Sequence, residues 1–134
     1  MRLPSSIFTI SIFFTTTVTD AASALSPPSR LWATHYNGNV YTLTFAEGKL
    51  SLTDTLKTCG EMPSWLTFDA ESRVLYCSDE SGSADPGMHG SLTAYQAAAD
   101  GKLTPIATTQ TVGGGVSSII FEAGEREKFL AIAH

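Results

Sequence analysis

The sequence predicts an all-β fold, and three observations support this prediction. Apolar or alternating runs rich in β-branched and aromatic residues follow one another at intervals of roughly ten residues from Leu31 onward. Turn-forming residues separate the runs, as at Asn37-Gly38-Asn39, where Asn and Gly both tolerate a positive φ. The one helix-favouring segment, residues 96–99, is too short to be a stable helix.

The runs predict nine short strands joined by turns, as in a meander. Pro63 is expected to close the loop before the fourth strand, because proline cannot donate to a sheet. In the second strand, Val40 and Thr42 should face one side of the sheet, and Tyr41 and Leu43 the other. The predicted strands are residues 31–36, 40–45, 49–57, 65–68, 74–78, 91–96, 103–109, 116–121 and 129–133.

Sequence landmarks recur 53 or 54 residues apart. They are Tyr41 and Tyr95, the Gly-Lys-Leu tripeptides at 48–50 and 101–103, and Ser64 and Ser117. A period of about 50 residues containing four short strands is the size of one β-propeller blade. The sequence therefore predicts an incomplete β-propeller, with about two four-stranded antiparallel blades and the start of a further one.

Residues 65–109 supply one full blade, with three strands before it and two after it. The chain stops at His134 part-way through a blade, so we expect a truncated propeller that cannot close into a ring. A self-contained β-sandwich of about nine strands is the alternative architecture.

The first 24 residues have the order of a secretory signal peptide. Arg2 precedes a short apolar run at residues 7–14, and Ala22-Ser23-Ala24 offers a small-x-small cleavage site. The run is too short to cross a bilayer, which needs about 20 apolar residues. We therefore expect a secreted protein whose mature domain covers residues 25–134 and has no membrane contact after signal removal.

Composition and charge limit the classes of partner. The 134 residues carry a net charge of −5, and the eight Lys and Arg residues are spread singly along the chain. No basic stripe can follow a phosphate backbone, so nucleic acid is not an expected partner.

Cys59 and Cys77 are the two cysteines, and they are the candidates for a disulfide in an oxidising compartment. Two buried thiols are the alternative, because the sequence does not fix the separation of the two Cβ atoms.

Other candidate sites have simpler structural interpretations. His35, His89 and His134 lack the close spacing of a metal pair. The acidic segment 79–85 departs from the calcium-hand pattern and is expected to be a solvated loop. Trp32 and Trp65 could stack on a sugar, but a core position is the expected role. The glycines at 113–115 lack the pattern of a phosphate-binding loop and are interpreted as a crossing between blades.

In order and at blade spacing, five segments resemble the seven-bladed propellers of the lactonase family. This family includes bacterial 6-phosphogluconolactonase and fungal 3-carboxy-cis,cis-muconate cyclase, and the resemblance is best with secreted fungal members. The segments are Leu31-Trp32-Ala33-Thr34-His35-Tyr36, Cys59-Gly60-Glu61-Met62-Pro63-Ser64-Trp65-Leu66, Val74-Leu75-Tyr76-Cys77-Ser78-Asp79-Glu80, Gly101-Lys102-Leu103-Thr104 and Leu130-Ala131-Ile132-Ala133-His134.

The resemblance implies hydrolysis of a lactone, or cyclisation of a muconate, without a metal or organic cofactor. The implied partner of a complete protein is a small-molecule lactone or carboxylate. His134 matches a histidine at a blade edge in secreted relatives and is the candidate catalytic residue. Because the family's machinery comes from several blades, we expect the truncated chain to be inactive. The alternative function is a noncatalytic secreted surface or adhesion module on the same scaffold.

Overall fold

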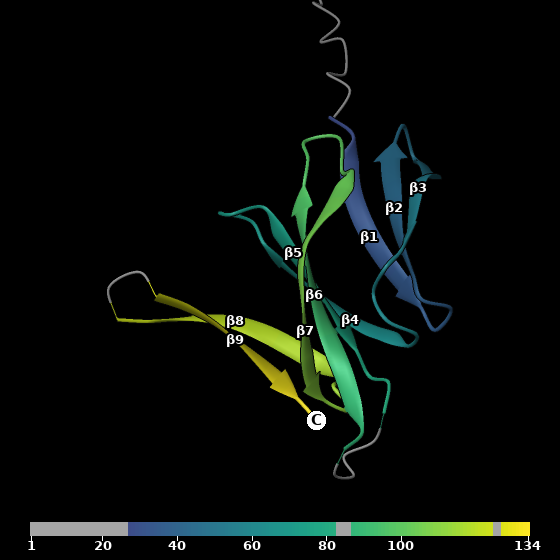
Figure 1. Cartoon of the computed structure of the whole chain (residues 1–134). Helices are drawn as coiled ribbons and strands as arrows, with labels where there is room; N and C mark the ends of the chain where they lie inside the picture. The colour runs from purple at the N-terminus through teal and green to yellow at the C-terminus, as the bar shows by residue number, and fades with distance from the viewer. Residues whose placement is uncertain (1–26, 83–86, 125–126) are drawn as a thin grey trace, which may run out of the picture.

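The computed structural model describes residues 27–82, 87–124 and 127–134, and these residues form strands and connections without a helix (Figure 1). Within these ranges, no helix is available to span a membrane. The predicted signal peptide, residues 1–24, lies outside the described residues. The strands are β1 (Ser29–His35), β2 (Asn39–Ala46), β3 (Lys49–Lys57), β4 (Pro63–Asp69), β5 (Val74–Asp79), β6 (His89–Ala97), β7 (Leu103–Val112), β8 (Ser117–Ala123) and β9 (Glu127–Ala133).

The strands form three separate antiparallel sheets, which confirms the all-β prediction and its division into blades. Sheet orders are β1-β2-β3, β4-β5-β6-β7 and β8-β9. We call these sheets blade 1, blade 2 and blade 3. Only blade 2 has four strands among the described residues, and its neighbours lie on either side of it (Figure 1). Three stacked sheets replace the two-sheet sandwich that we considered as an alternative.

Turn residues explain the hairpins within each blade. Gly38 has a φ of 79° in the connection between β1 and β2, a conformation that costs glycine little because it has no Cβ. The β1–β2 hairpin then pairs in register from Ser29 with Phe45 to His35 with Asn39. Val40 and Thr42 lie on the same side of β2, as predicted, and the structure buries that side against blade 2.

Pro63 and Asp79 differ most informatively from the predicted strand limits. Pro63 is the first residue of β4, where it is buried, rather than a loop residue. A first position suits proline because its missing N–H leaves no gap further along the ladder. The sequence predicts a solvated loop from Asp79 onward, but Asp79 ends β5 and is buried. Its hydrogen bonds, described below, explain this burial.

The core lies between blades 1 and 2. Its fully buried apolar residues are Val40, Cys59, Leu75, Cys77, Tyr95, Ala97 and Leu103. Trp32 on β1 packs against this cluster and against Phe68 on β4, with ring centroids 4.9 Å apart. The Trp32 Nε1–H donates a 3.0 Å hydrogen bond to the carbonyl of Gly101. One tryptophan therefore serves both the apolar and the polar part of the contact.

Blades 2 and 3 meet through more polar contacts. The Thr67 hydroxyl donates to the Ser118 carbonyl at 2.9 Å, and the Ser64 hydroxyl donates to the Gly115 carbonyl at 2.7 Å. Since Thr67 faces blade 3, Leu66 beside it faces the core shared with blade 1. Blade 2 thus contacts a neighbouring blade on each face, whereas its outer strand β7 is largely exposed.

Antiparallel strands place the connections of the blades at two opposite ends. The loop end contains residues 36–38, 58–62, 80–82, 87–88 and 113–116, together with His134. The turn end contains residues 47–48, 70–73, 98–102 and 124. Residues 83–86 and 125–126 of these connections lie outside the described part of the chain. The long connections gather at the loop end.

Candidate functional site at the loop end

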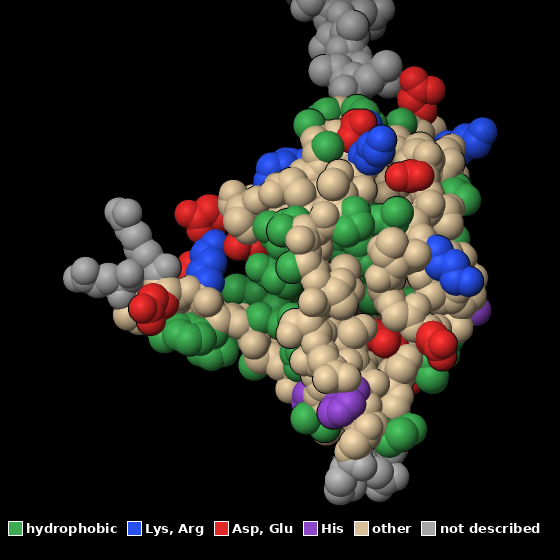
Figure 2. Space-filling model, in the orientation of Figure 1, with side chains coloured by type: hydrophobic (Ala, Val, Ile, Leu, Met, Phe, Trp, Pro, Cys, Tyr) green, Lys and Arg blue, Asp and Glu red, His purple; other side chains and the backbone are tan. Residues whose placement is uncertain are grey.

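All three histidines stand at strand boundaries of the loop end. His35 ends β1, His89 begins β6, and His134 follows β9. Figure 2 shows histidine side chains along the lower part of the molecule, over the connections that form this end. Within the described ranges, no three His, Cys, Asp or Glu side chains come close enough to hold a metal ion. The three histidines therefore lie at the same end of the blades without forming a metal site among the described residues.

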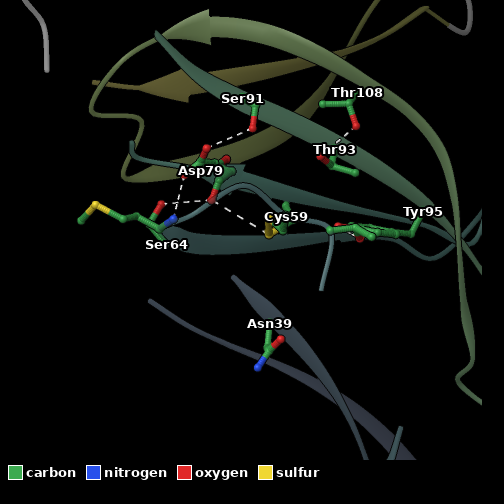
Figure 3. Close-up of a disulfide and its surroundings, with 12 residues drawn as sticks. Asn39, Cys59, Ser64, Asp79, Ser91, Thr93, Tyr95 and Thr108 are labelled. Atoms are coloured by element: carbon green, nitrogen blue, oxygen red, sulfur yellow. Dashed lines mark hydrogen bonds between the residues drawn. A yellow bond between two sulfur atoms is a disulfide. The ribbon is translucent and has the colours of Figure 1, made fainter. Parts of the chain in front are cut away.

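Asp79 organises the backbone of the loop end. Asp79 is only 5% exposed. Oδ1 accepts hydrogen bonds from the Met62 N–H at 3.0 Å, the Ser81 N–H at 3.1 Å and the Ser81 hydroxyl at 2.5 Å. Oδ2 accepts from the Ser91 hydroxyl at 3.1 Å (Figure 3). A buried carboxylate needs such donors to offset lost hydration, and through these bonds Asp79 holds the connections of the loop end together.

The connection between β3 and β4 is fixed by a disulfide and a glycine. Cys59 in this connection is bonded to Cys77 on β5, with their Cα atoms 6.1 Å apart (Figure 3). Both sulfurs are buried. Gly60 has a φ of 61°, and a Cβ there would lie 2.0 Å from Oδ2 of Asp79. Close approach to the carboxylate therefore requires glycine at this position.

Glu80 connects three segments of the loop end. Its N–H donates to the Met62 carbonyl at 3.0 Å, and its carbonyl accepts from the Gly114 N–H at 3.3 Å. A hydrogen bond to the Glu80 carboxylate raises the pKa of the Tyr36 hydroxyl above its ordinary value. The negative charge of Glu80 therefore faces blade 1, whereas its backbone joins blade 2 to the crossing at 113–116.

His134 lies beside that crossing. Its Nδ1 is 3.3 Å from the Gly113 carbonyl oxygen, and a Cβ on Gly115 would lie 3.4 Å from its Cε1. The same Cβ would lie 3.1 Å from the side chain of Ile132. The imidazole and Ile132, both of blade 3, thus share the space beside Gly115, whereas nothing lies within 4 Å of a Cβ placed on Gly114.

Ile132 also lines a cleft of about 460 Å³ between β4 and the β8–β9 sheet. We call it the Trp65 cleft. Its lining is mostly apolar and consists of Trp65, Ser117, Ser118, Ile119, Ala131, Ile132 and Ala133. Trp65 is 45% exposed, so the expectation of a core position for this tryptophan was wrong. It faces the shorter side chains of blade 3, which leave its ring uncovered.

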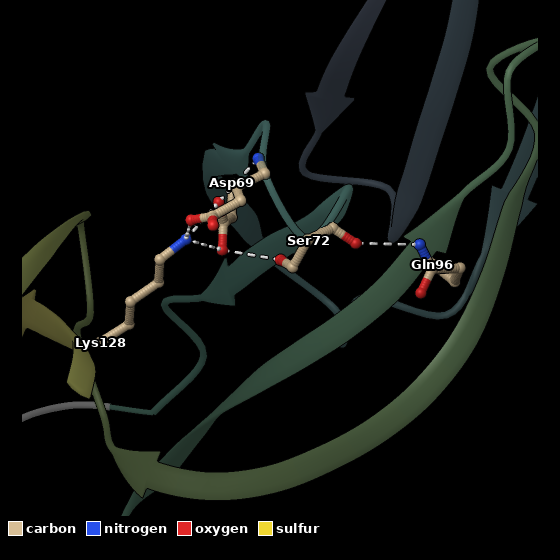
Figure 4. A network of polar contacts seen from close by, with 5 residues as sticks. Asp69, Ser72, Gln96 and Lys128 are labelled. Carbon is tan, nitrogen blue, oxygen red and sulfur yellow. Dashed lines mark hydrogen bonds and ion pairs between the residues drawn. The ribbon is translucent and has the colours of Figure 1, made fainter. Parts of the chain in front are cut away.

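The turn end holds a second, charged cleft of about 670 Å³. Lys128 Nζ lies 3.0 Å from Oδ2 of Asp69 and 2.6 Å from Oε2 of Glu71 (Figure 4). Hydrogen bonds from Ser72 and then Lys128 lower the pKa of Asp69 to about 2. Hydrogen bonds to Glu71 and Asp69 raise the pKa of Lys128 to about 12. These ionised groups already pair with one another, so the cleft is an interblade contact.

The sequence patterns did not predict the burial of Asp79 or the exposure of Trp65. The segment 79–82 has the composition of a turn, and the donors Met62 and Ser91 are distant in sequence from the carboxylate. The only local signal was the end of an apolar strand at Ser78-Asp79. Ser83, Ala84 and Asp85 of the considered calcium cluster lie outside the described residues.

Comparison with known proteins gives one match. The sequence model of the family described as "Lactonase, 7-bladed beta-propeller" matches residues 30–134, which include almost all of the described chain. Neither the curated proteins nor the solved structures contain a significant match.

Proposed function

Because this chain belongs to the lactonase family of seven-bladed β-propellers, we propose that it serves lactone chemistry as part of a larger ring of blades. The chemistry is hydrolysis of a lactone or, as in the muconate cyclases, closure of one. The family match over residues 30–134 is the observation that carries this proposal. We further propose that the 134-residue chain does not turn over a lactone by itself.

The Trp65 cleft and the neighbouring His134 are the groups that suit a sugar-derived lactone. An indole face binds the apolar face of a sugar ring, and Ser117 and Ser118 offer hydroxyls at the wall of the cleft. The His134 imidazole can accept a proton from a water molecule that attacks the lactone carbonyl. The ring C–O bond then breaks, and the imidazolium returns the proton to the departing alkoxide.

The proposed inactivity of the isolated chain follows from a second requirement of lactone hydrolysis. An anionic tetrahedral intermediate needs donors or cations aimed at its oxygen. The described residues that line the Trp65 cleft include no Lys or Arg. In a ring, facing blades would supply these groups across the central channel.

We also propose that the chain is secreted. The disulfide between Cys59 and Cys77 fits an oxidising compartment, and we propose that residues 1–24 direct the chain there, as in secreted fungal members of the family.

Turnover and binding by the purified chain test this proposal together. We expect no hydrolysis of glucono-δ-lactone above the spontaneous rate in a pH-stat assay, and no change in muconate absorbance. A gluconate or lactone titration should change the tryptophan fluorescence, and Trp65→Phe should remove that change. Turnover that His134→Ala abolishes would overturn the proposed inactivity. A fluorescence response that survives Trp65→Phe would remove the cleft from the proposed site.

The exposure of Trp65 also supports a second candidate, a noncatalytic surface module that binds glycans. A glycan array distinguishes the two functions. Tight binding to cell-wall or matrix glycans without any response to gluconate would favour the surface module.

A further inference from the structure

Another polar cleft lies at the turn end, between blade 1 and the β6–β7 turn of blade 2. Its volume is about 460 Å³. Two basic side chains, Arg30 and Lys102, line it together with two acidic ones, Asp54 and Asp100, and three threonines. Figure 2 shows basic and acidic side chains together over the upper part of the molecule, where Figure 1 places the β6–β7 turn. We call this the Arg30 cleft.

Arg30 is held in place by blade 2, but its guanidinium lacks an anionic partner. Its Nε–H donates a 2.7 Å hydrogen bond to the Asp100 carbonyl. A Cβ on Gly101 would lie 3.0 Å from Cδ of Arg30, so the turn packs closely against the aliphatic part of this side chain. Nη1, by contrast, is buried and has no hydrogen-bond partner among the described residues. A buried cationic donor without an acceptor is unfavourable, and an anionic oxygen would relieve it.

The acidic residues of the cleft do not supply that oxygen. Oδ1 of Asp54 accepts a hydrogen bond from the Thr55 N–H at 2.9 Å, and Oδ1 of Asp100 accepts one from the Lys102 N–H at 3.0 Å. Each carboxylate is therefore bonded to the backbone beside it. Within the described ranges, neither Arg30 nor Lys102 forms an ion pair.

The corresponding contact between blades 2 and 3 is neutralised within the chain. There Lys128 of blade 3 pairs with Asp69 and Glu71 of blade 2. In the Arg30 cleft, blade 2 offers Arg30 the neutral carbonyl oxygen of Asp100 instead. The two interblade clefts of the turn end thus differ in one respect, because only the Arg30 cleft leaves its basic groups open to an anion from solution.

We propose that the Arg30 cleft binds a small carboxylate monoanion. The guanidinium of Arg30 would donate paired hydrogen bonds to the carboxylate, and Lys102 would act as a point charge beside it. Because Nη1 is covered, the guanidinium would shift toward the cleft as the ligand binds. The two acidic side chains balance the two basic ones, so a dianion such as sulfate should bind less well than a monoanion. The Trp65 cleft lies on the other face of blade 2 and is a separate site.

Acetate titration of the ¹⁵N-labelled chain at constant ionic strength, followed by NMR, tests the proposal. The Arg30 Nε–H and the amides of Thr44 and Lys102 should shift along saturable curves, and sulfate should bind more weakly. Arg30→Met and Lys102→Met should each weaken acetate binding at least about tenfold, the factor that one hydrogen bond to a charged group supports. Lys57→Met, which removes an exposed positive charge at the far end of β3, is the control and should bind as the unchanged chain does.

Asp54→Asn is the complementary variant. Asparagine keeps an acceptor for the Thr55 N–H and removes one negative charge from the cleft. It should strengthen acetate binding and reduce the discrimination against sulfate. Because Arg30→Met also removes the hydrogen bond to Asp100, Lys102→Met and Asp54→Asn keep the test independent of that contact.

Four results would overturn the proposal. They are shifts that do not saturate, tighter binding of sulfate than of acetate by the unchanged chain, equal affinities in Lys102→Met and Lys57→Met, and loss of acetate binding in Trp65→Phe. The last result would place acetate in the Trp65 cleft. Absence of a lactone or gluconate response at Trp65 would leave the acetate titration unaffected, so failure of the proposed function and failure of this site are distinguishable.

Discussion

The loop end and the turn end of the blades are held together in different ways. At the loop end, a disulfide and one buried carboxylate with four hydrogen bonds join the connections. At the turn end, an exposed cluster around Lys128 joins the β8–β9 hairpin to blade 2. Buried networks resist local opening because a broken bond leaves a desolvated group, whereas exposed pairs separate into water at small cost. Rigid geometry is therefore concentrated where the candidate site lies.

Removal of the Asp79 carboxylate gives the largest expected effect. Asp79→Ala leaves two backbone N–H groups and two hydroxyls without their acceptor. Hydrogen bonds to a charged group are worth about 1.5 to 3 kcal/mol each and are not additive, so we expect a loss of about 4 kcal/mol. Urea unfolding measures it. Asp54→Ala, which removes one exposed hydrogen bond from the Thr55 N–H, is the control. Equal urea midpoints for Asp79→Ala and Asp54→Ala would show that the buried network at the loop end adds no stability beyond that of an exposed contact.

Reduction of the disulfide should come next in size. Cys59 and Cys77 are 18 residues apart, and closing a loop of that length contributes about 3 kcal/mol through the entropy of the unfolded chain. The double variant Cys59→Ala/Cys77→Ala should show this loss in urea, and a reducing agent should then have no further effect. A midpoint that reductant leaves unchanged in the unmodified chain would show that the bridge does not constrain the unfolded state.

Two glycines compare the ends directly, because both have a similar positive φ. Gly60 has a φ of 61° beside Asp79, whereas Gly48 has a φ of 74° in a turn with nothing near its missing Cβ. The backbone cost of alanine in this conformation is about 1 kcal/mol at each position. Gly60→Ala must also displace the carboxylate, so we expect it to cost at least about 2 kcal/mol. Similar unfolding free energies for the two variants would mean that the loop end yields as easily as a free turn.

Local patterns were enough to predict the strands but not the contacts between blades. The run from Lys49 to Lys57 matched its strand end to end, because alternating residues between two turns specify a strand without reference to its partners. Asp79 and Trp65 depend on partners far along the chain. A carboxylate is buried only where donors converge on it, and an indole is exposed only where the neighbouring blade leaves it uncovered. The residues adjacent in sequence predict neither condition.

The turn end should show the smallest effect, and one confined to acidic or strongly basic pH. The pKa of Asp69 is lowered from 3.8 to about 2, so its contribution to stability is complete above pH 3.8 and is lost as pH falls through about 2. The pKa of Lys128 is raised from 10.5 to about 12, so its contribution is complete below pH 10.5 and is lost above about 12. At neutral pH both groups are charged, and no titration of this contact should be visible.

Carbon NMR of the Asp69 carboxyl between pH 1 and pH 6 can separate the causes. Ser72→Ala removes the largest contribution to the lowered pKa, and Lys128→Met removes the next. Both variants should raise the pKa of Asp69 toward 3.8, and Ser72→Ala should raise it at least as far. If only Lys128→Met moved the titration, the cation would be the main cause, and the β8–β9 hairpin would depend on salt. If the hydroxyl accounts for most of the shift, the pKa in the unmodified chain should change little with ionic strength, because a hydrogen bond within the β4–β5 turn is not screened as an exposed ion pair is.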